Sequence, residues 1–338
     1  MRRAFSSGGN IIIKKIFLSL LLAICLAAAI GVAGYSVYRI GTYIELYIEL
    51  NDKVGNNAII HDERILLRAK KSIDQFIHYK VMYYKDARFD VKMREDRRTF
   101  EITENDETYV VENHISMREN SDLNGGLSEA QEKQSIEWED ISKFPKYQRV
   151  LDESKKLLYA YIRKSDILND KEYLISELEK ISVKIGEIDT AGISITIEDT
   201  KTICINRSDI RKAVIVHEFI HALQDITRNG LDSGNPMFVE IMTDIITNAV
   251  YPNNNIFQMS MYRDYNQNVL NFIGIFREKA IEAFFYGYDV LYDEITEDEW
   301  YLFLYTIEAA VRAPGAAHYG NCYDHLISKW VGMGEREV

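Results

Sequence analysis

The sequence predicts an α+β fold that follows a single N-terminal membrane helix. Three observations lead to this prediction: an uncharged apolar run at residues 16–38, short β-rich stretches in the middle of the chain, and helical periodicity over most of the rest. Of the 338 residues, 47% are hydrophobic, and only 4 are proline and 18 glycine. This composition is typical of a helix-rich globular protein with a buried core.

Charge and cysteine content exclude two classes of protein. The 40 basic and 52 acidic residues give a net charge of −12, which argues against a broad nucleic-acid-binding surface. Three cysteines are too few for a disulfide scaffold. Cys25 lies in the apolar run, while Cys204 and Cys322 can either pair or remain thiols, and neither has a second cysteine at zinc-finger spacing.

The apolar run from Ile16 to Tyr38 sets the topology. At about 1.5 Å per residue it can cross a hydrocarbon core of roughly 30 Å, so we expect a transmembrane signal-anchor at 16–38. Basic residues precede it, so the positive-inside rule keeps residues 1–15 in the cytoplasm and the remainder outside. Cleavage as a signal peptide would instead release a secreted protein, and a lipoprotein box at Cys25 is disfavoured by Ile24. All three readings export the bulk of the chain.

The first exported region is expected to hold a helix and a β-hairpin. After a connector at 40–56, the apolar spacing of residues 58–84 predicts a helix. Alternating β-rich stretches at 99–104 and 108–112 flank residues 105–107 and predict a hairpin. Residues 119–135 are polar and glycine-containing, so they are expected to form a loop. We therefore expect a juxtamembrane helix and hairpin region at 39–135 and a second domain at 136–338.

The second domain is expected to begin with helices, continue with a small sheet and end with helices. Helical periodicity covers 136–181, and strands are predicted at 183–188, 193–198 and 202–206. Ser208 is the expected N-cap of a helix that runs to residue 228, and Asn235-Pro236 opens another that runs to 250. Thr296 and Glu299 form a capping box before a helix to residue 312, and a last short helix is expected at 323–330.

The chemistry-bearing motif is His217-Glu218-Phe219-Ile220-His221, in the middle of the predicted 208–228 helix. Positions i and i+4 of a helix share a face, so both imidazoles can bind one zinc ion while Glu218 lies beside the bound water. A catalytic zinc keeps three protein ligands, and Glu240 on the next predicted helix is the expected third. Asp244, one turn further, is expected to orient a ligand histidine, and it is the rival for the third-ligand position.

The pattern HExxH followed by ExxxD, in residues 217–221 and 240–244, resembles the gluzincin metallopeptidases, the thermolysin-like branch of the zincins. The strand at 202–206 that leads into the motif helix is similar to the zincin arrangement, in which an edge strand of a small sheet binds the substrate backbone. The resemblance covers residues 183–250. It implies a zincin-like metallopeptidase domain at 136–338, one Zn²⁺ per chain and a protein or peptide substrate. Thr227 stands where a metzincin needs a third histidine.

The resemblance also implies the reaction. Zinc would lower the pKa of water toward about 7 and polarise the scissile carbonyl, and Glu218 would act as the general base. The oxyanion donor would come from the downstream helical region, where the candidates are Tyr251, Tyr262, Tyr265, His318, Tyr319 and His325. His318 and Tyr319 are favoured because they follow the turn-like residues 314–317, and loops often position catalytic groups.

The expected function is therefore that of a membrane-anchored, extracytoplasmic zinc metallopeptidase. Three alternatives stay open. One is a catalytically silent zincin-like module that binds or senses a partner through residues 40–180. Another is a zinc hydrolase of a non-protein cell-envelope substrate. The third is a purely structural anchor, which would hold no stoichiometric zinc.

Overall fold

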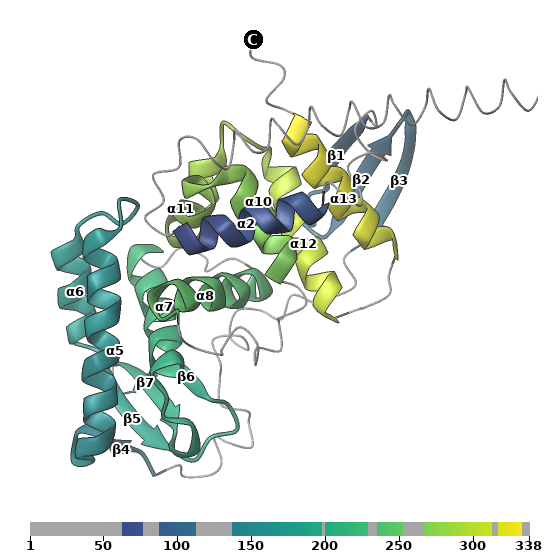
Figure 1. Cartoon of the computed structure of the whole chain (residues 1–338). Coiled ribbons are helices and arrows are strands. Elements are labelled where there is room, and N and C mark those ends of the chain that lie inside the picture. Colours follow the sequence, from purple (N-terminus) through teal and green to yellow (C-terminus); the bar gives the residue numbers. More distant parts are fainter. Residues whose placement is uncertain are drawn as a thin grey trace, which may run out of the picture. The chain divides into compact units, whose positions relative to one another are not determined.

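The structure, a computed structural model, describes residues 63–76, 88–112, 137–197, 200–228, 235–252, 266–312 and 317–332. Those segments form a mixed α+β fold (Figure 1) and belong to one compact unit that spans residues 50–338. The predicted membrane anchor, the connector at 40–56 and the loop at 119–135 lie outside the described residues. Among the described helices, none combines the length and the apolar character that a membrane span requires.

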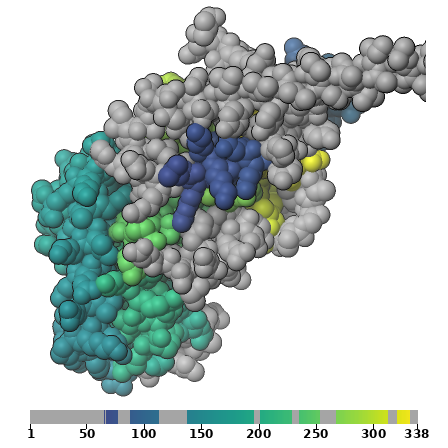
Figure 2. Space-filling view, in the orientation of Figure 1, coloured from purple at the N-terminus to yellow at the C-terminus, as the bar shows by residue number. Residues whose placement is uncertain are grey.

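Helix α2 (Glu63–Phe76) confirms part of the helix predicted at 58–84. Its apolar face packs on α10 (Asn266–Phe276), where the side chain of Ile73 lies directly over Gly274. The Ser72 hydroxyl adds a hydrogen bond of 2.7 Å to Asn271 Oδ1. The other side of α2 lies at the molecular surface (Figure 2), and Leu67 there is 66% exposed.

A three-stranded antiparallel meander follows, with β2 between β1 and β3. The expected hairpin is confirmed as β2 (Thr99–Glu104) and β3 (Glu107–Glu112), joined by Asn105 and Asp106, both with positive φ. Strand β1 (Phe89–Met93) was not predicted, although Phe89, Val91 and Met93 alternate with the charged residues Asp90 and Lys92. The meander packs on the C-terminal helices, and Phe100 stacks on Tyr305 of one of them.

The region with helical periodicity at 136–181 is not continuously helical. It begins with β4 (Glu139–Asp140) and a 3₁₀ turn, η3 (Ile141–Lys143), and it then forms α5 (Pro145–Lys164) and α6 (Lys171–Glu179). The break has a local cause, because the Ser165 hydroxyl accepts hydrogen bonds from the backbone N–H groups of Ile167 and Leu168.

The second sheet has the strand order β4-β5-β7-β6, so β6 is an edge strand. Strands β5 (Ser182–Gly186), β6 (Gly192–Ile197) and β7 (Thr200–Asn206) lie close to the three predicted positions. Strand β5 runs parallel to β7, whereas β6 and β7 form an antiparallel pair. A 3₁₀ turn, η4 (Arg207–Asp209), then leads into α7 (Lys212–Arg228).

The expected N-cap at Ser208 is wrong. Ser208 lies inside η4, where its N–H and hydroxyl both donate to Asn206 Oδ1, so Asn206 caps that turn and α7 begins at Lys212. By contrast, the expected cap of α8 (Pro236–Val250) is confirmed, because Asn235 Oδ1 accepts from the N–H groups of Met237 and Phe238.

The C-terminal helices are α11 (Glu278–Tyr286), the 3₁₀ turn η5 (Tyr288–Leu291), α12 (Glu297–Arg312) and α13 (Ala317–Gly332). The Thr296–Glu299 capping box of α12 is confirmed by its two reciprocal hydrogen bonds. Helix α13 begins earlier than the predicted residue 323. Aromatic rings join α8, α10, α12 and α13 around Phe272, which contacts Phe238, Trp300, Phe303 and Trp330. Both predicted regions, 39–135 and 136–338, thus contribute to the packing of these helices.

Candidate metal centre

Helix α7 presents the HExxH motif to α8, against which it packs (Figure 1). Its apolar positions are buried: Val214, Ile215, Val216, Phe219, Ile220, Ala222 and Leu223 are at most 4% exposed. The helical period leaves His217 and His221 together on the remaining face, with their ring centroids 4.7 Å apart. The motif helix is therefore fixed by its packing, and only its polar face is left for chemistry.

Three side chains from the two helices converge. Nε2 of His217 lies 3.0 Å from Nε2 of His221, and the Glu240 oxygens lie 3.3 Å and 3.4 Å from these two nitrogens. Zinc bonds of about 2.0–2.1 Å in a tetrahedral site place ligand atoms roughly 3.3 Å apart. The donor set and its spacing therefore fit a single metal ion, and His217, His221 and Glu240 form a cluster that could hold one.

Asp244 and Thr243 contact the outer sides of the two rings. Asp244 Oδ1 lies 3.0 Å from Nδ1 of His217, the side of the ring that faces away from Glu240. Asp244 thus contacts the cluster from outside, and Glu240 rather than Asp244 joins the two imidazoles within it. Thr243 Oγ1 lies 3.4 Å from Nδ1 of His221. Thr243 was not among the predicted site residues, although residues three apart on a helix lie on the same face and Thr243 follows Glu240 at that spacing.

Glu218 is buried beneath the first residue of strand β6. Glu218 is only 7% exposed. A Cβ atom built on Gly192 would lie 2.6 Å from Glu218 Oε1. Glycine at position 192 therefore permits a close approach between the edge strand and the carboxylate. Burial raises the pKa of Glu218, while the nearby imidazoles of His217 and His221 act in the opposite direction.

The other groups of the cluster stabilise one another's charge. Burial alone would lower the pKa of His217, but its contacts with Asp244 and Glu240 outweigh burial and raise the pKa well above its ordinary value. Burial alone would raise the pKa of Glu240, yet the two imidazoles hold the pKa of this carboxyl far below its usual range. Glu240 is therefore a carboxylate at neutral pH, which is the form that binds a cation.

The expected oxyanion donors do not all lie near one another. His318 and Tyr319 lie in the first turn of α13; their side chains are outside the described residues, as are Tyr262 and Tyr265. His325 lies elsewhere, because it is buried against Phe89 and its Nε2 is 3.0 Å from Glu104. Tyr251 ends α8, and the Lys212 ammonium lies 5.9 Å from its ring centroid. The assignment of the oxyanion donor to His318 or Tyr319 stays a prediction.

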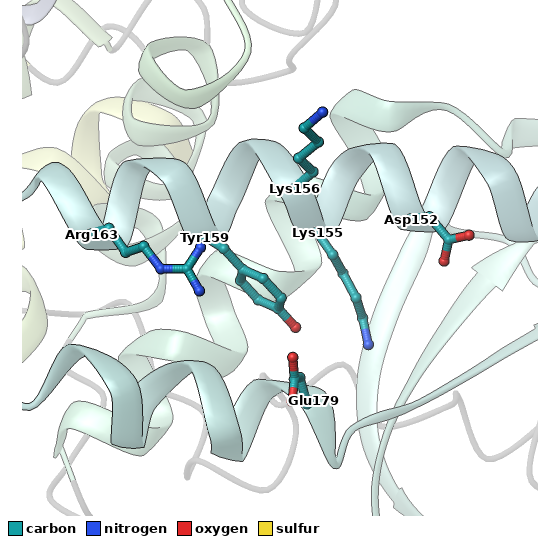
Figure 3. A pocket seen from close by; sticks show the side chains of 6 residues that line it. All are labelled: Asp152, Lys155, Lys156, Tyr159, Arg163 and Glu179. Atoms are coloured by element: carbon teal, nitrogen blue, oxygen red, sulfur yellow. The ribbon is translucent and has the colours of Figure 1, made fainter.

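A pocket of about 380 Å³ lies between α5 and α6. Figure 3 shows Lys155 and Tyr159 of α5 directed toward the same space as Glu179 of α6, whereas Lys156 points away. The Lys155 ammonium also lies 5.3 Å from the ring centroid of Phe219, inside the HExxH motif. This contact helps to hold α5 against the buried side of α7.

Cys204 and Cys322 are both free and fully buried. The thiols therefore do not form the disulfide that the sequence left open. Burial raises the pKa of Cys204 to about 12 and that of Cys322 to about 11, so both are protonated at neutral pH. Neither belongs to the His217, His221 and Glu240 cluster.

Comparisons of this chain with protein-family models, with curated proteins and with solved structures found no match.

Proposed function

We propose that the protein is a zinc-dependent metallopeptidase whose domain is zincin-like. The observation that carries the proposal is the convergence of two imidazole Nε2 atoms and one carboxylate, with a second, buried carboxylate on the same helix. Two histidines and one glutamate are the ligand set of a catalytic zinc that keeps a fourth position open. When bound there, zinc would lower the pKa of water toward about 7 and polarise a carbonyl group.

The chain's own residues supply the remaining chemistry in this proposal. Glu218 takes a proton from the attacking water and returns it to the leaving amine, a task that suits a carboxyl group whose pKa is raised by burial. The edge strand β6 passes beside Glu218 at Gly192, and an edge strand can pair with an extended peptide. The edge strand is the feature that favours a peptide bond as the group that is cleaved.

The proposal extends to location and substrate. The apolar run at 16–38 would anchor the chain in the cell membrane and leave the catalytic residues outside the cytoplasm, where protein or peptide substrates are met. Signal cleavage would release the same activity in secreted form. Binding without hydrolysis, or hydrolysis of a non-protein envelope substrate, are the outcomes that would replace the peptidase assignment.

The test combines metal analysis with peptide hydrolysis on the full-length protein. We expect about one zinc per chain, loss of that zinc in the double variant H217A/H221A, and cleavage of a mixed peptide library by the wild type. E218Q should keep the zinc and lose activity by at least about a hundredfold, because general-base catalysis contributes 10²–10⁴-fold. E172Q, on the exposed face of α6, is the matched control and should behave as wild type.

Each failure has a separate meaning. A folded wild type that takes up no zinc would overturn the metal site itself. If the protein binds zinc but cleaves neither peptides nor purified cell-wall fragments, it is a binding module with a metal site. If it binds zinc and cleaves the cell-wall fragments but not the peptides, its substrate is a non-protein component of the envelope. Full activity in E218Q would refute the role of Glu218.

A further inference from the structure

Thr243 occupies a place in the cluster that neither metal binding nor general-base catalysis explains. It lies on α8 between Glu240 and Asp244 and is fully buried, with 0% of its surface exposed. Its Oγ1 lies 3.4 Å from Nδ1 of His221. A buried hydroxyl next to an imidazole N–H forms a hydrogen bond that fixes the orientation of the ring.

The arrangement of the two rings determines which nitrogen carries the proton. Both Nε2 atoms face Glu240, and each needs a free lone pair to bind a metal there. In the neutral imidazole the proton is then on Nδ1, so each Nδ1–H needs an acceptor. Asp244 Oδ1 is the acceptor beside His217, and Thr243 Oγ1 holds the equivalent position beside His221.

We propose that Thr243 is a positioning residue for the second histidine: its hydroxyl oxygen accepts the Nδ1–H proton of His221 and holds Nε2 toward the metal position. The inference deepens the proposed zinc site and rests on it. Because Glu240, Thr243 and Asp244 lie within a little more than one turn, α8 would supply one ligand and orient both of the others.

The test compares three variants of the full-length protein. T243V removes the hydroxyl and keeps the shape, whereas T243S keeps the hydroxyl. T247V is the matched control, because Thr247 is equally buried one turn later and its Oγ1 has no hydrogen-bond partner in the described part of the chain. Zinc affinity is measured by competition with a chelator, and the hydrogen bond at Nδ1 of His221 by ¹H–¹⁵N NMR of the zinc-loaded protein, in which zinc on Nε2 leaves the ring proton on Nδ1.

We expect T243V to bind zinc about tenfold to a hundredfold more weakly, as is typical when the partner of a ligand histidine is lost. T243S should restore affinity, and T247V should match the wild type. In the zinc-loaded wild type and in T243S, the hydrogen bond should shift the Nδ1–H proton of His221 downfield relative to its position in T243V.

An Nδ1–H proton of His221 without a hydrogen-bonded shift in the zinc-loaded wild type, or unchanged zinc affinity in T243V, would overturn the inference. The wild-type spectrum needs no variant at position 243 and no peptidase activity. It therefore tests the hydrogen bond even if T243V does not fold, and a wild type that takes up zinc but cleaves no peptide would overturn the peptidase assignment alone.

Discussion

At the scale of single residues, the site depends on how closely two segments approach. Gly192 begins β6, and the carboxyl group of Glu218 fills the space where a side chain at position 192 would lie. The same contact shields Glu218 from solvent, and this burial raises its pKa. The absence of a side chain at Gly192 on β6 thus determines both the position and the pKa of the Glu218 carboxyl group on α7.

Substitution G192A should displace Glu218 without removing metal ligands. The new Cβ would lie 2.7 Å from Glu218 Cγ and 2.8 Å from Cδ, so the carboxyl group has to move. A catalytic group misplaced by about 1 Å can cost roughly a hundredfold in rate, so we expect kcat/KM for a cleaved peptide to fall about tenfold to a hundredfold while zinc content stays the same.

Gly320 provides the control for that substitution. Outside its own helix, a Cβ at Gly320 on α13 would meet no atom of the described residues within 4 Å, so G320A should retain wild-type kcat/KM. Equal activity in G192A and G320A would show that the contact between β6 and Glu218 does not position the carboxyl group.

At the scale of elements, α8 carries much of the site. Glu240, Thr243 and Asp244 project from it toward α7, and the aromatic ring of Phe238 joins it to α10 and α12. Asn235 sets where this helix begins, and its amide Nδ2 also donates a hydrogen bond of 3.0 Å to the buried Glu308 carboxylate on α12. The start of α8 is therefore fixed both by its cap and by a neighbouring helix.

Substitution N235A should lower the free energy of unfolding by about 1–2 kcal/mol through the lost cap, and further through the lost hydrogen bond to Glu308. Urea titration of the full-length protein measures the change. N235S is the informative comparison, since serine caps the helix but cannot replace the amide donor, and it should recover the cap contribution alone. An alanine variant as stable as the wild type would contradict this account.

Elements were predictable where their signals are local. The caps at Asn235 and Thr296 and the turn at Asn105-Asp106 are each defined by a few neighbouring residues, and the structure has all three. Strand β1, which pairs with β2, was missed although Phe89, Val91 and Met93 alternate with Asp90 and Lys92, a local signal of a half-buried strand. The start of α7 was misplaced because Asn206, not Ser208, accepts the capping hydrogen bonds at the end of β7.

At the scale of the whole molecule, residues far apart in the sequence form one core. Helix α2 packs on α10, and the Ser72 hydroxyl bonds to Asn271 and to the carbonyl of Gln267. The meander contacts α12 and α13, and Lys329 of α13 donates to the carbonyl oxygen of Phe89. Helix α2 and the meander are thereby part of the same packing unit as the helices behind the metal cluster.

The contact between Ile73 and Gly274 tests this packing. A Cβ at Gly274 would lie 2.0 Å from Ile73 Cδ1, so G274A should be destabilising by about 1–3 kcal/mol from overpacking, partly offset by the roughly 1 kcal/mol better helix propensity of alanine. In an I73V background the clashing methyl group is absent and G274A should cost less.

Urea unfolding of the two single variants and of I73V/G274A gives the coupling free energy, which we expect to be about 1 kcal/mol. Additive effects would show that α2 and α10 do not pack at these residues.

The sequence by itself determined what depends on neighbours along the chain. The i, i+4 spacing of His217 and His221 puts both rings on one face of any helix that contains them, and the capping residues of α8 define where that helix begins. Only the tertiary structure decided which carboxylate meets the rings, that Thr243 and Asp244 contact their outer nitrogens, and that Gly192 covers Glu218. The physical reason is that these contacts join separate helices and strands, and their geometry is set by packing of the whole core rather than by local spacing.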